Sequence, residues 1–230
     1  MSRRTVVVVR PTVSGIDEVA TRRLIDQVRS AAQQDVRLAY LDVGSPSVHE
    51  VLDEAVVDGV SDVVLLPVAV PRDKYLTTWT RRAVANWSET RPAKQLTVTM
   101  HEPDSLADAV ASHLGGLLDE PGTPIRDSPA SYRSPAWSTI EAHDRHVLIC
   151  KGPRCMAYGA GPLHRALTAN SKNTETKVTG TGCLSPCNLG PLAIVNPPGE
   201  WYGHLHPEDA SALVRDQVIA GGLAHKRVPR

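Results

Sequence analysis

The sequence contains no phenylalanine, and its other aromatic residues are few. With four Trp and five Tyr among 230 residues, aromatic side chains make up 4% of the chain. Hydrophobic residues nevertheless account for 41%, so any core must be built mainly from Val, Leu, Ile and Ala. Because 230 residues exceed the usual size of one domain, we expect two small domains.

The sequence also lacks net charge and long apolar stretches. Its 25 basic and 25 acidic residues cancel, whereas proteins that bind nucleic acid or membrane surfaces usually carry a basic excess. The first apolar run, Val6–Val9, is too short for a signal peptide, and no run reaches the length of a membrane span. We therefore expect a cytoplasmic protein that neither binds nucleic acid nor inserts into a membrane.

The chain has only four cysteines, and they form two close pairs. Cys150 and Cys155 lie in CKGPRC, and Cys183 and Cys187 lie in CLSPC. Thiols stay reduced in the cytoplasm, so this clustering favours metal binding over disulfide bonds. Four thiolates from two loops are typical of an iron–sulfur cluster. A structural zinc site is the alternative, although its usual spacing fits the first pair only marginally.

Residues 1–118 are expected to form the first domain. Apolar, β-branched runs predict four strands that alternate with helices, which is typical of a parallel sheet with both faces covered. The predicted strands are Thr5–Val9, Val36–Leu41, Asp62–Leu66 and Leu96–Met100. Ligands bind such sheets at the carboxyl ends of the strands. The candidate ligand contacts at this edge are Arg10, Arg72, Lys74, Tyr75 and His101.

The second predicted helix begins with a capping box formed by Ser47 and Glu50. Its apolar face consists of Val48, Val51, Leu52, Ala55 and Val56. His49 lies on the opposite side of the helix, and we interpret it as a solvated surface residue.

This half of the chain resembles the class II chelatases that insert cobalt or iron into sirohydrochlorin. The similarity covers residues 5 to about 118 and depends on the order of the elements and on the stretch GSPSVHEVLDEAVVDGVSDVVLLPVAV. Those chelatases hold their metal with two histidines, and Arg10 and Tyr75 stand at about those places here. Neither side chain offers a neutral imidazole nitrogen. The resemblance therefore implies a degenerate domain that docks a partner or binds a tetrapyrrole.

The rest of the chain divides into three parts. Residues 119–143 are rich in proline and are expected to form a linker. Residues 144–222 predict a second domain with elements in the order βαβββα, and residues 223–230 form a basic tail. The expected fold class is thus α/β, with a parallel four-stranded sheet followed by a small thioredoxin-like domain.

Residues 146–220 resemble the thioredoxin-like [2Fe-2S] ferredoxins, including the peripheral [2Fe-2S] subunit of respiratory complex I. The resemblance is carried by CKGPRCMAYGAGPLHRAL, VTGTGCLSPCNLGPLAIVNPPGEWYG and HPEDASALV. It favours a [2Fe-2S] cluster over zinc. By this resemblance Cys150 and Cys155 would bind one iron, and Cys183 and Cys187 would bind the other.

Basic residues surround the first cysteine pair. Lys151, Arg154 and Arg165 form either a docking rim for an acidic redox partner or charge compensation for an anionic cluster. We expect an electron-transfer protein rather than a self-sufficient enzyme. Together the two resemblances imply a one-electron carrier in tetrapyrrole metabolism, such as sirohaem or cobalamin synthesis.

Two alternatives remain. One is an active sirohydrochlorin chelatase with an accessory cluster. The other is an iron–sulfur subunit or sensor of a larger oxidoreductase, because fold alone does not decide function. A homodimer is compatible with each of these functions.

Overall fold

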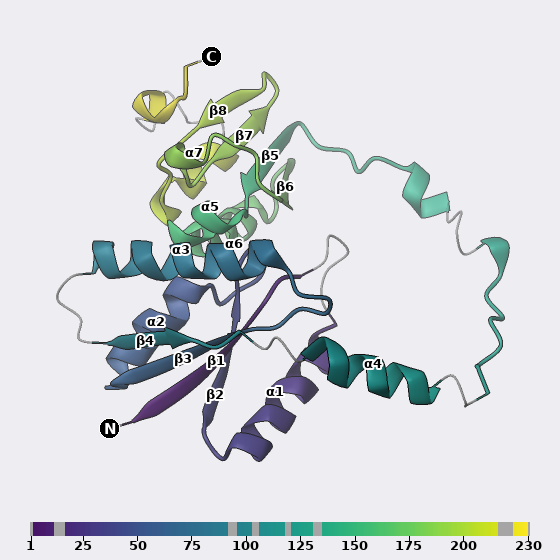
Figure 1. Cartoon of the computed structure of the whole chain (residues 1–230). Helices are drawn as coiled ribbons and strands as arrows, with labels where there is room; N and C mark the ends of the chain where they lie inside the picture. The colour runs from purple at the N-terminus through teal and green to yellow at the C-terminus, as the bar shows by residue number, and fades with distance from the viewer. Residues whose placement is uncertain are drawn as a thin grey trace.

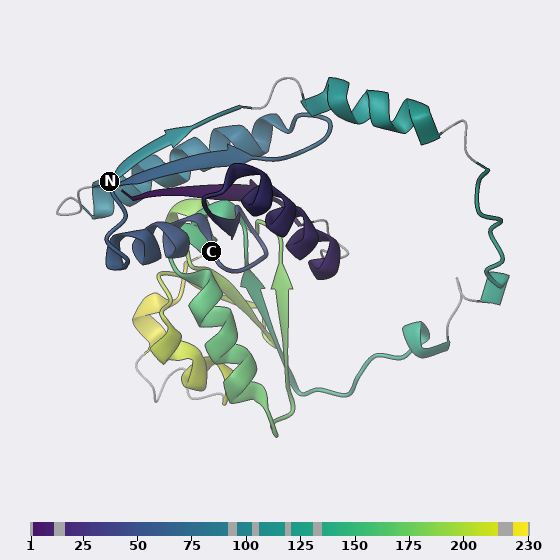
Figure 2. The same cartoon turned by 90° about the horizontal axis from the view of Figure 1, so that it is seen from below.

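The computed structural model describes residues 2–11, 17–91, 96–102, 106–117, 121–130, 135–215 and 223–229. These residues form an N-terminal unit (residues 3–117) and a C-terminal unit (residues 145–226), each built on its own four-stranded sheet (Figure 1). Residues 121–130 are exposed and follow an extended path away from both units (Figure 2). Within the described ranges, no helix is long and apolar enough to cross a membrane.

The sheet of the N-terminal unit is fully parallel, with the strand order β2-β1-β3-β4. Its strands are β1 (Arg3–Val9), β2 (Asp35–Tyr40), β3 (Asp62–Pro67) and β4 (Thr97–Met100). They alternate with the helices α1 (Glu18–Ala32), α2 (Val48–Val57), α3 (Lys74–Thr90) and α4 (Leu106–Leu117). Strand β1 is central and buried after its first residue, as its β-branched run predicts. This alternation confirms the fold class expected for the first half.

Helices cover the two faces of this sheet unequally. α2 and α3 pack on one face and build the larger core, which includes Leu52, Leu76 and Trp87. α1 packs on the other face, with Ile25 as its only buried residue. α4 extends away from the sheet, and none of its residues is buried (Figure 1). Most of the stability of the N-terminal unit should therefore come from the α2 and α3 side.

The helices α2 and α3 both begin at the carboxyl edge of the sheet. The predicted capping box of α2 is confirmed, because Ser47 Oγ accepts the Glu50 N–H and Glu50 Oε2 accepts the Ser47 N–H. Asp73 caps α3 by accepting the N–H groups of Tyr75 and Leu76. Each cap satisfies backbone donors that would otherwise lack partners. The first turns of both helices are thereby fixed beside the strand ends.

The sheet of the C-terminal unit is mixed, with the strand order β6-β5-β7-β8. Its strands are β5 (Arg145–Cys150), β6 (Thr176–Thr181), β7 (Ala193–Asn196) and β8 (Glu200–Tyr202). β5 pairs in parallel with β6 and antiparallel with β7, which in turn pairs antiparallel with β8. Helices α6 (Ala160–Ser171) and α7 (Ala210–Val214) complete the expected βαβββα order. A short helix, α5 (Pro153–Ala157), begins between the first two cysteines and includes Cys155, where none is expected.

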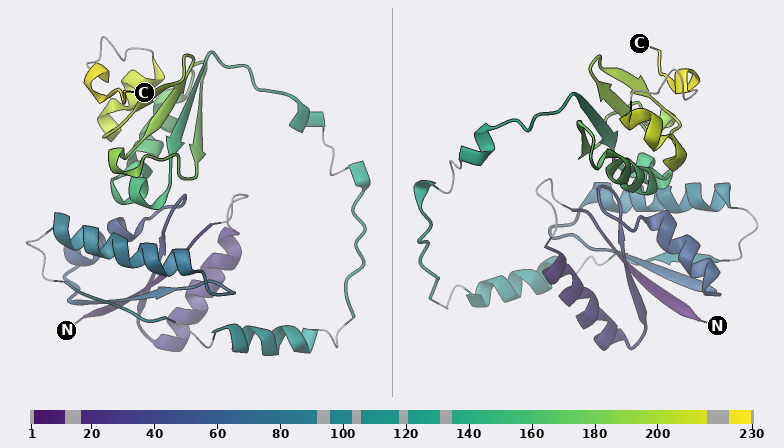
Figure 3. Two further views of the ribbon diagram at one scale, coloured as in Figure 1. Left: turned by 45° about the horizontal axis from the view of Figure 1, so that its top comes forward. Right: turned by 180° about the vertical axis from the view of Figure 1, so that it is seen from behind.

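The C-terminal unit packs against the α2 and α3 side of the N-terminal unit (Figures 1 and 3). The N–H of Val43 donates to the carbonyl oxygen of Lys151 at 2.8 Å. Arg165 pairs with Glu50 at 3.1 Å and donates to Ser45 Oγ at 3.2 Å. These contacts hold the cysteine-bearing end of the second unit beside the carboxyl edge of the first sheet.

The prediction that His49 is solvated is wrong. Its side chain is only 3% exposed, and its Nε2 lies 2.8 Å from the carbonyl oxygen of Ala83. The ring also interacts with the backbone of Ala157 in the C-terminal unit. Burial lowers the pKa of His49, so the ring is neutral at pH 7. His49 is buried because both α3 and the C-terminal unit pack against its side of α2.

Candidate metal centre

Four different segments deliver the cysteines to one end of the second sheet. Cys150 is the last residue of β5, and Cys155 lies in α5. Cys183 follows the end of β6, and Cys187 begins the short 3-10 helix η3 (Cys187–Leu189). Because β5 and β6 are parallel, with Cys150 opposite Thr181, their carboxyl ends open at the same edge. The two loops that follow these strands therefore meet.

The sulfur atoms lie close together within each pair and between the pairs. Cys183 Sγ is 3.3 Å from Cys187 Sγ, and the thiol of Cys155 hydrogen bonds to Cys150. Across the pairs, the N–H of Leu184 donates to Cys150 Sγ at 3.4 Å. Among the described residues, no group of three or more His, Cys, Asp or Glu side chains is placed to hold a single metal ion. Sulfurs that arrive two by two suit a binuclear centre, in which each metal takes one pair.

The surroundings of Cys150 stabilise its thiolate. The thiol of Cys155 and the backbone N–H groups of Leu184 and Gly152 donate to its sulfur and lower its pKa, although burial acts in the opposite direction. The pKa of Cys187 is raised, first by burial and then by Cys183. Backbone N–H groups directed at a sulfur are also the groups that tune iron–sulfur centres.

Two glycines allow the backbone to approach the cysteines. A Cβ at Gly190 would lie 2.8 Å from Cys155 Sγ, and a Cβ at Gly152 would lie 3.0 Å from Cys183 Cα. The first distance is too short for a side chain at Gly190, and the second would force Cys183 to shift by a few tenths of an ångström. The space around the sulfurs is thus bounded by backbone, whose N–H groups can reach sulfur ligands directly.

The two pairs differ in exposure. Cys150 and Cys155 are buried, at 1% and 2% exposed. Cys183 is exposed, and Cys187 is half-buried. The second pair therefore forms the outer edge of the site.

Comparison with known proteins accounts for this arrangement. No protein-family model matches the chain. A curated relative, the putative 2Fe-2S ferredoxin of Priestia megaterium, is 34% identical over 93 residues, which cover 39% of this chain and 72% of the relative. The chain belongs to the 2Fe-2S ferredoxins. It therefore carries a [2Fe-2S] cluster, and the four thiols with their nearby N–H groups fit one.

Two solved structures are also similar to parts of this ferredoxin. The wild-type thioredoxin-like [2Fe-2S] ferredoxin from Aquifex aeolicus is 27% identical, with a TM-score of 0.34, and the match covers 39% of this chain and 100% of the other. A putative cobalamin biosynthesis CbiX protein from Marinobacter aquaeolei is 13% identical, with a TM-score of 0.39, and the match covers 51% of this chain and 95% of the other. The parallel sheet of the N-terminal unit is established by its strand order, β2-β1-β3-β4, and not by this similarity.

The candidate residues at the carboxyl edge of the N-terminal sheet are largely engaged with one another. Arg10 pairs with Asp42 at 3.0 Å and with Asp73 at 3.3 Å, and its guanidinium lies 4.5 Å from the centre of the Tyr75 ring. Glu102 accepts hydrogen bonds from Arg72 and Arg81. Lys74 and His101 are exposed at the same edge. The structure thus brings these side chains to one edge, with the charges of Arg10 and Arg72 already balanced by carboxylates.

The three basic residues near the first cysteine pair have different surroundings. Lys151 is half-buried, and burial, followed by the charge of Arg165, lowers its pKa. Arg165 contacts Glu50 of the N-terminal unit, so it connects the two units. Arg154 bonds to Asn188 beside Cys187, and its guanidinium lies 5.7 Å from the centre of the Trp79 ring. Of the three, Arg154 lies nearest the outer edge of the site.

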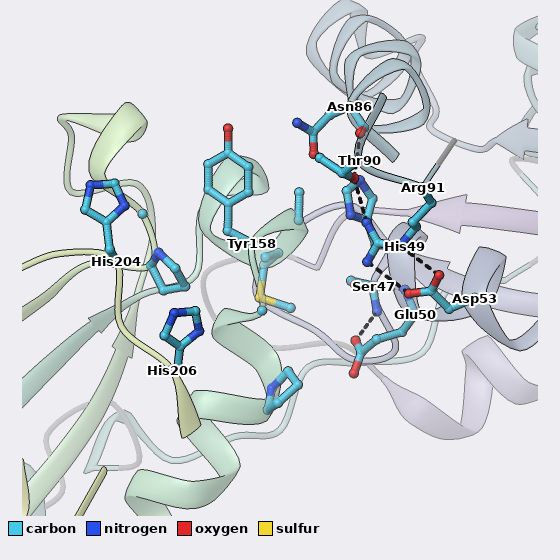
Figure 4. Close-up of a pocket in the computed structure, with 16 residues that line it drawn as sticks. Ser47, His49, Glu50, Asp53, Asn86, Thr90, Arg91, Tyr158, His204 and His206 are labelled. Atoms are coloured by element: carbon cyan, nitrogen blue, oxygen red, sulfur yellow. Dashed lines mark hydrogen bonds and ion pairs between the residues drawn. The ribbon is translucent and has the colours of Figure 1, made fainter. Parts of the chain in front are cut away.

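A pocket of about 490 Å³ lies between the two units (Figure 4). His49, Asp53 and Arg91 line it from the N-terminal unit, and His204 and His206 line it from the C-terminal unit. Arg91 already pairs with Asp53 at 2.8 Å. The pocket therefore marks a place where the two units meet. Its residues come from distant parts of the chain, so no sequence motif identifies it.

Proposed function

We propose that Cys150 and Cys155 hold one iron of the [2Fe-2S] cluster, that Cys183 and Cys187 hold the other, and that the protein is a one-electron carrier. The observation that carries this proposal is the convergence of the four sulfurs, two by two, in a chain that belongs to the 2Fe-2S ferredoxins. When bound, such a cluster accepts and releases a single electron. The exposure of Cys183 puts the second pair where a redox partner can approach.

The protein's own groups would set the properties of this centre. The N–H groups of Gly152 and Leu184 donate to Cys150, which favours its thiolate form and disperses negative charge. The buried first pair keeps water away from one side of the site. Clustered cysteines that bind iron instead of forming disulfide bonds suit a reducing compartment, and we propose that the protein works in the cytoplasm.

A reductive titration tests the electron-carrier proposal. Protein purified without air should take up one electron per chain from dithionite, lose visible absorbance, and regain its spectrum on reoxidation. Reduction that needs two electrons, or that destroys the chromophore irreversibly, would rule out a carrier role.

We further propose that the N-terminal unit serves as a docking domain rather than a metal-inserting enzyme, in a setting of tetrapyrrole metabolism. Support comes from its resemblance to the class II chelatases combined with Arg10 and Tyr75 at the positions of the two metal-binding histidines. A guanidinium repels metal cations and does not accept protons. Burial raises the pKa of Tyr75, so this phenol is protonated at pH 7 and is a poor metal ligand. Tetrapyrrole carboxylates could reach Arg10 or Arg72 only by displacing the carboxylates that now pair with them.

We expect no chelatase activity from this protein. When cobalt(II) or iron(II) is added to the full-length chain with sirohydrochlorin, the absorption spectrum should change no faster than in the control that contains sirohydrochlorin and metal without protein. Among the described residues at this edge, His101 is the exposed imidazole, so His101→Ala is the matched variant. Turnover above background that is lost in His101→Ala would establish the chelatase alternative instead.

A further inference from the structure

The outer edge of the cysteine site borders the N-terminal unit as well as the C-terminal unit. Arg154 connects the two, because it bonds to Asn188 next to Cys187 and its guanidinium lies 5.7 Å from the Trp79 ring centre. Tyr75, one turn before Trp79 on α3, has its ring centre 5.9 Å from that of Trp79. A molecule that approaches the exposed Cys183 and Cys187 edge therefore also meets the first two turns of α3.

This part of α3 carries the side chains that protein interfaces favour. Tyr75 is 37% exposed, and Trp79 is half-buried. The guanidinium of Arg82 lies 4.8 Å from the Trp79 ring centre, so arginines from both units contact one indole. Trp79, Arg82, Arg154 and Tyr158 border a depression of about 380 Å³. Tryptophan, tyrosine and arginine in such a pocket are the residue types that dominate binding energy between proteins.

Basic side chains outnumber acidic ones around this depression, which Arg82, Arg154 and Glu89 line. Within the described ranges, no carboxylate forms an ion pair with Arg82 or Arg154, whereas Arg10 and Arg81 have carboxylate partners. Lys74 is exposed on the same helix, and Glu89 near its end is its only acidic residue. Two unpaired guanidinium groups beside one ring complement carboxylates of a partner.

We propose that Tyr75, Trp79 and Arg82 of the N-terminal unit form, together with Arg154, the docking surface for an acidic redox protein. This rests on the proposed electron-carrier function and gives the N-terminal unit a role in it. In the exchange, one electron leaves the reduced cluster and reduces the partner's one-electron acceptor, and no covalent bond changes. The arginines hold the partner's carboxylates, and the aromatic rings provide apolar contact area beside the exposed cysteines.

Charge reversal on each unit tests the proposal without a known partner. Arg82→Glu and Arg154→Glu place the change on the two halves of the surface, and Arg23→Glu is the matched control. Arg23 is exposed on α1, which covers the opposite face of the N-terminal sheet. The probe for binding is poly-L-glutamate, measured by calorimetry, and the probe for transfer is oxidation of the reduced protein by hexacyanoferrate(III) or hexaammineruthenium(III).

We expect Arg82→Glu and Arg154→Glu each to weaken poly-L-glutamate binding by on the order of three- to tenfold. Each should also lower the rate of oxidation by the anionic hexacyanoferrate(III) by on the order of three- to tenfold. Both variants should raise the rate of oxidation by the cationic hexaammineruthenium(III), and added salt should reduce all these differences from the wild type. Arg23→Glu should match the wild type. If Arg82→Glu also matches the wild type while Arg154→Glu does not, docking is confined to the C-terminal unit and the proposal is overturned. If the reduced wild-type protein transferred no electron to either oxidant, the carrier function would be contradicted. The poly-L-glutamate measurement would still show whether Arg82 and Arg154 form a binding surface for carboxylates.

Discussion

Cys155→Ser is expected to give a folded protein without a cluster. Cys155 is 2% exposed and lies in contact with Cys150. Serine is a harder ligand than cysteine and ionises far less readily. Because position 155 is buried, water cannot stabilise the alkoxide form of the serine. Absorbance in the visible range and bound iron should therefore both fall to background in the purified variant.

Cys183→Ser should cause a milder defect, because Cys183 is exposed on a loop. We expect a cluster with an altered spectrum and faster loss of iron. Asn188→Ser is the matched control, since Asn188 is exposed in the same region and supplies no sulfur. Far-UV circular dichroism separates loss of the cluster from loss of the fold. A Cys155→Ser protein with the iron content and spectrum of the wild type would contradict the proposed ligand set.

Trp87→Ala is expected to cause the largest loss of stability in the N-terminal unit. Trp87 is 2% exposed in the core between the sheet and α3, and its Nε1 donates to Asp53 Oδ1 at 3.1 Å. Truncating a buried tryptophan removes its apolar contacts and leaves a cavity, which typically costs about 3–5 kcal/mol of unfolding free energy. Urea denaturation followed by circular dichroism measures this change.

Trp87→Phe is the control that separates volume from hydrogen bonding. It retains most of the apolar contact area and removes only the donor to Asp53, which keeps its ion pair with Arg91. We expect a loss of about 1–2 kcal/mol for this variant. If Trp87→Ala were no more destabilising than Trp87→Phe, the core assigned to the α2 and α3 side would be wrong.

The regular parts of the fold could be predicted because local patterns determine them. The buried run Val6–Val9 and the capping box of Ser47 and Glu50 depend on short-range features of the sequence. The cysteine pairs could be recognised in the same way, because each pair lies in one loop. The short helix α5 escaped prediction because five residues, Pro153–Ala157, are too few to show a helical period.

Other parts could not be predicted because they depend on how the two units pack. Helical periodicity places His49 on the polar side of α2, yet α3 and the C-terminal unit together bury it there. Arg165 was expected at a docking rim, and the structure pairs it with Glu50, 115 residues earlier in the chain. The contact of Trp79 with Arg154 likewise joins both units. No local pattern encodes contacts over such separations.

Metal and sulfide analysis of the wild-type protein, purified without air, decides whether the four cysteines hold a [2Fe-2S] cluster. We expect two iron atoms and two acid-labile sulfides per chain, because the four cysteines would each donate to one iron of a [2Fe-2S] cluster. Colourless protein with one zinc per chain and no labile sulfide would contradict it.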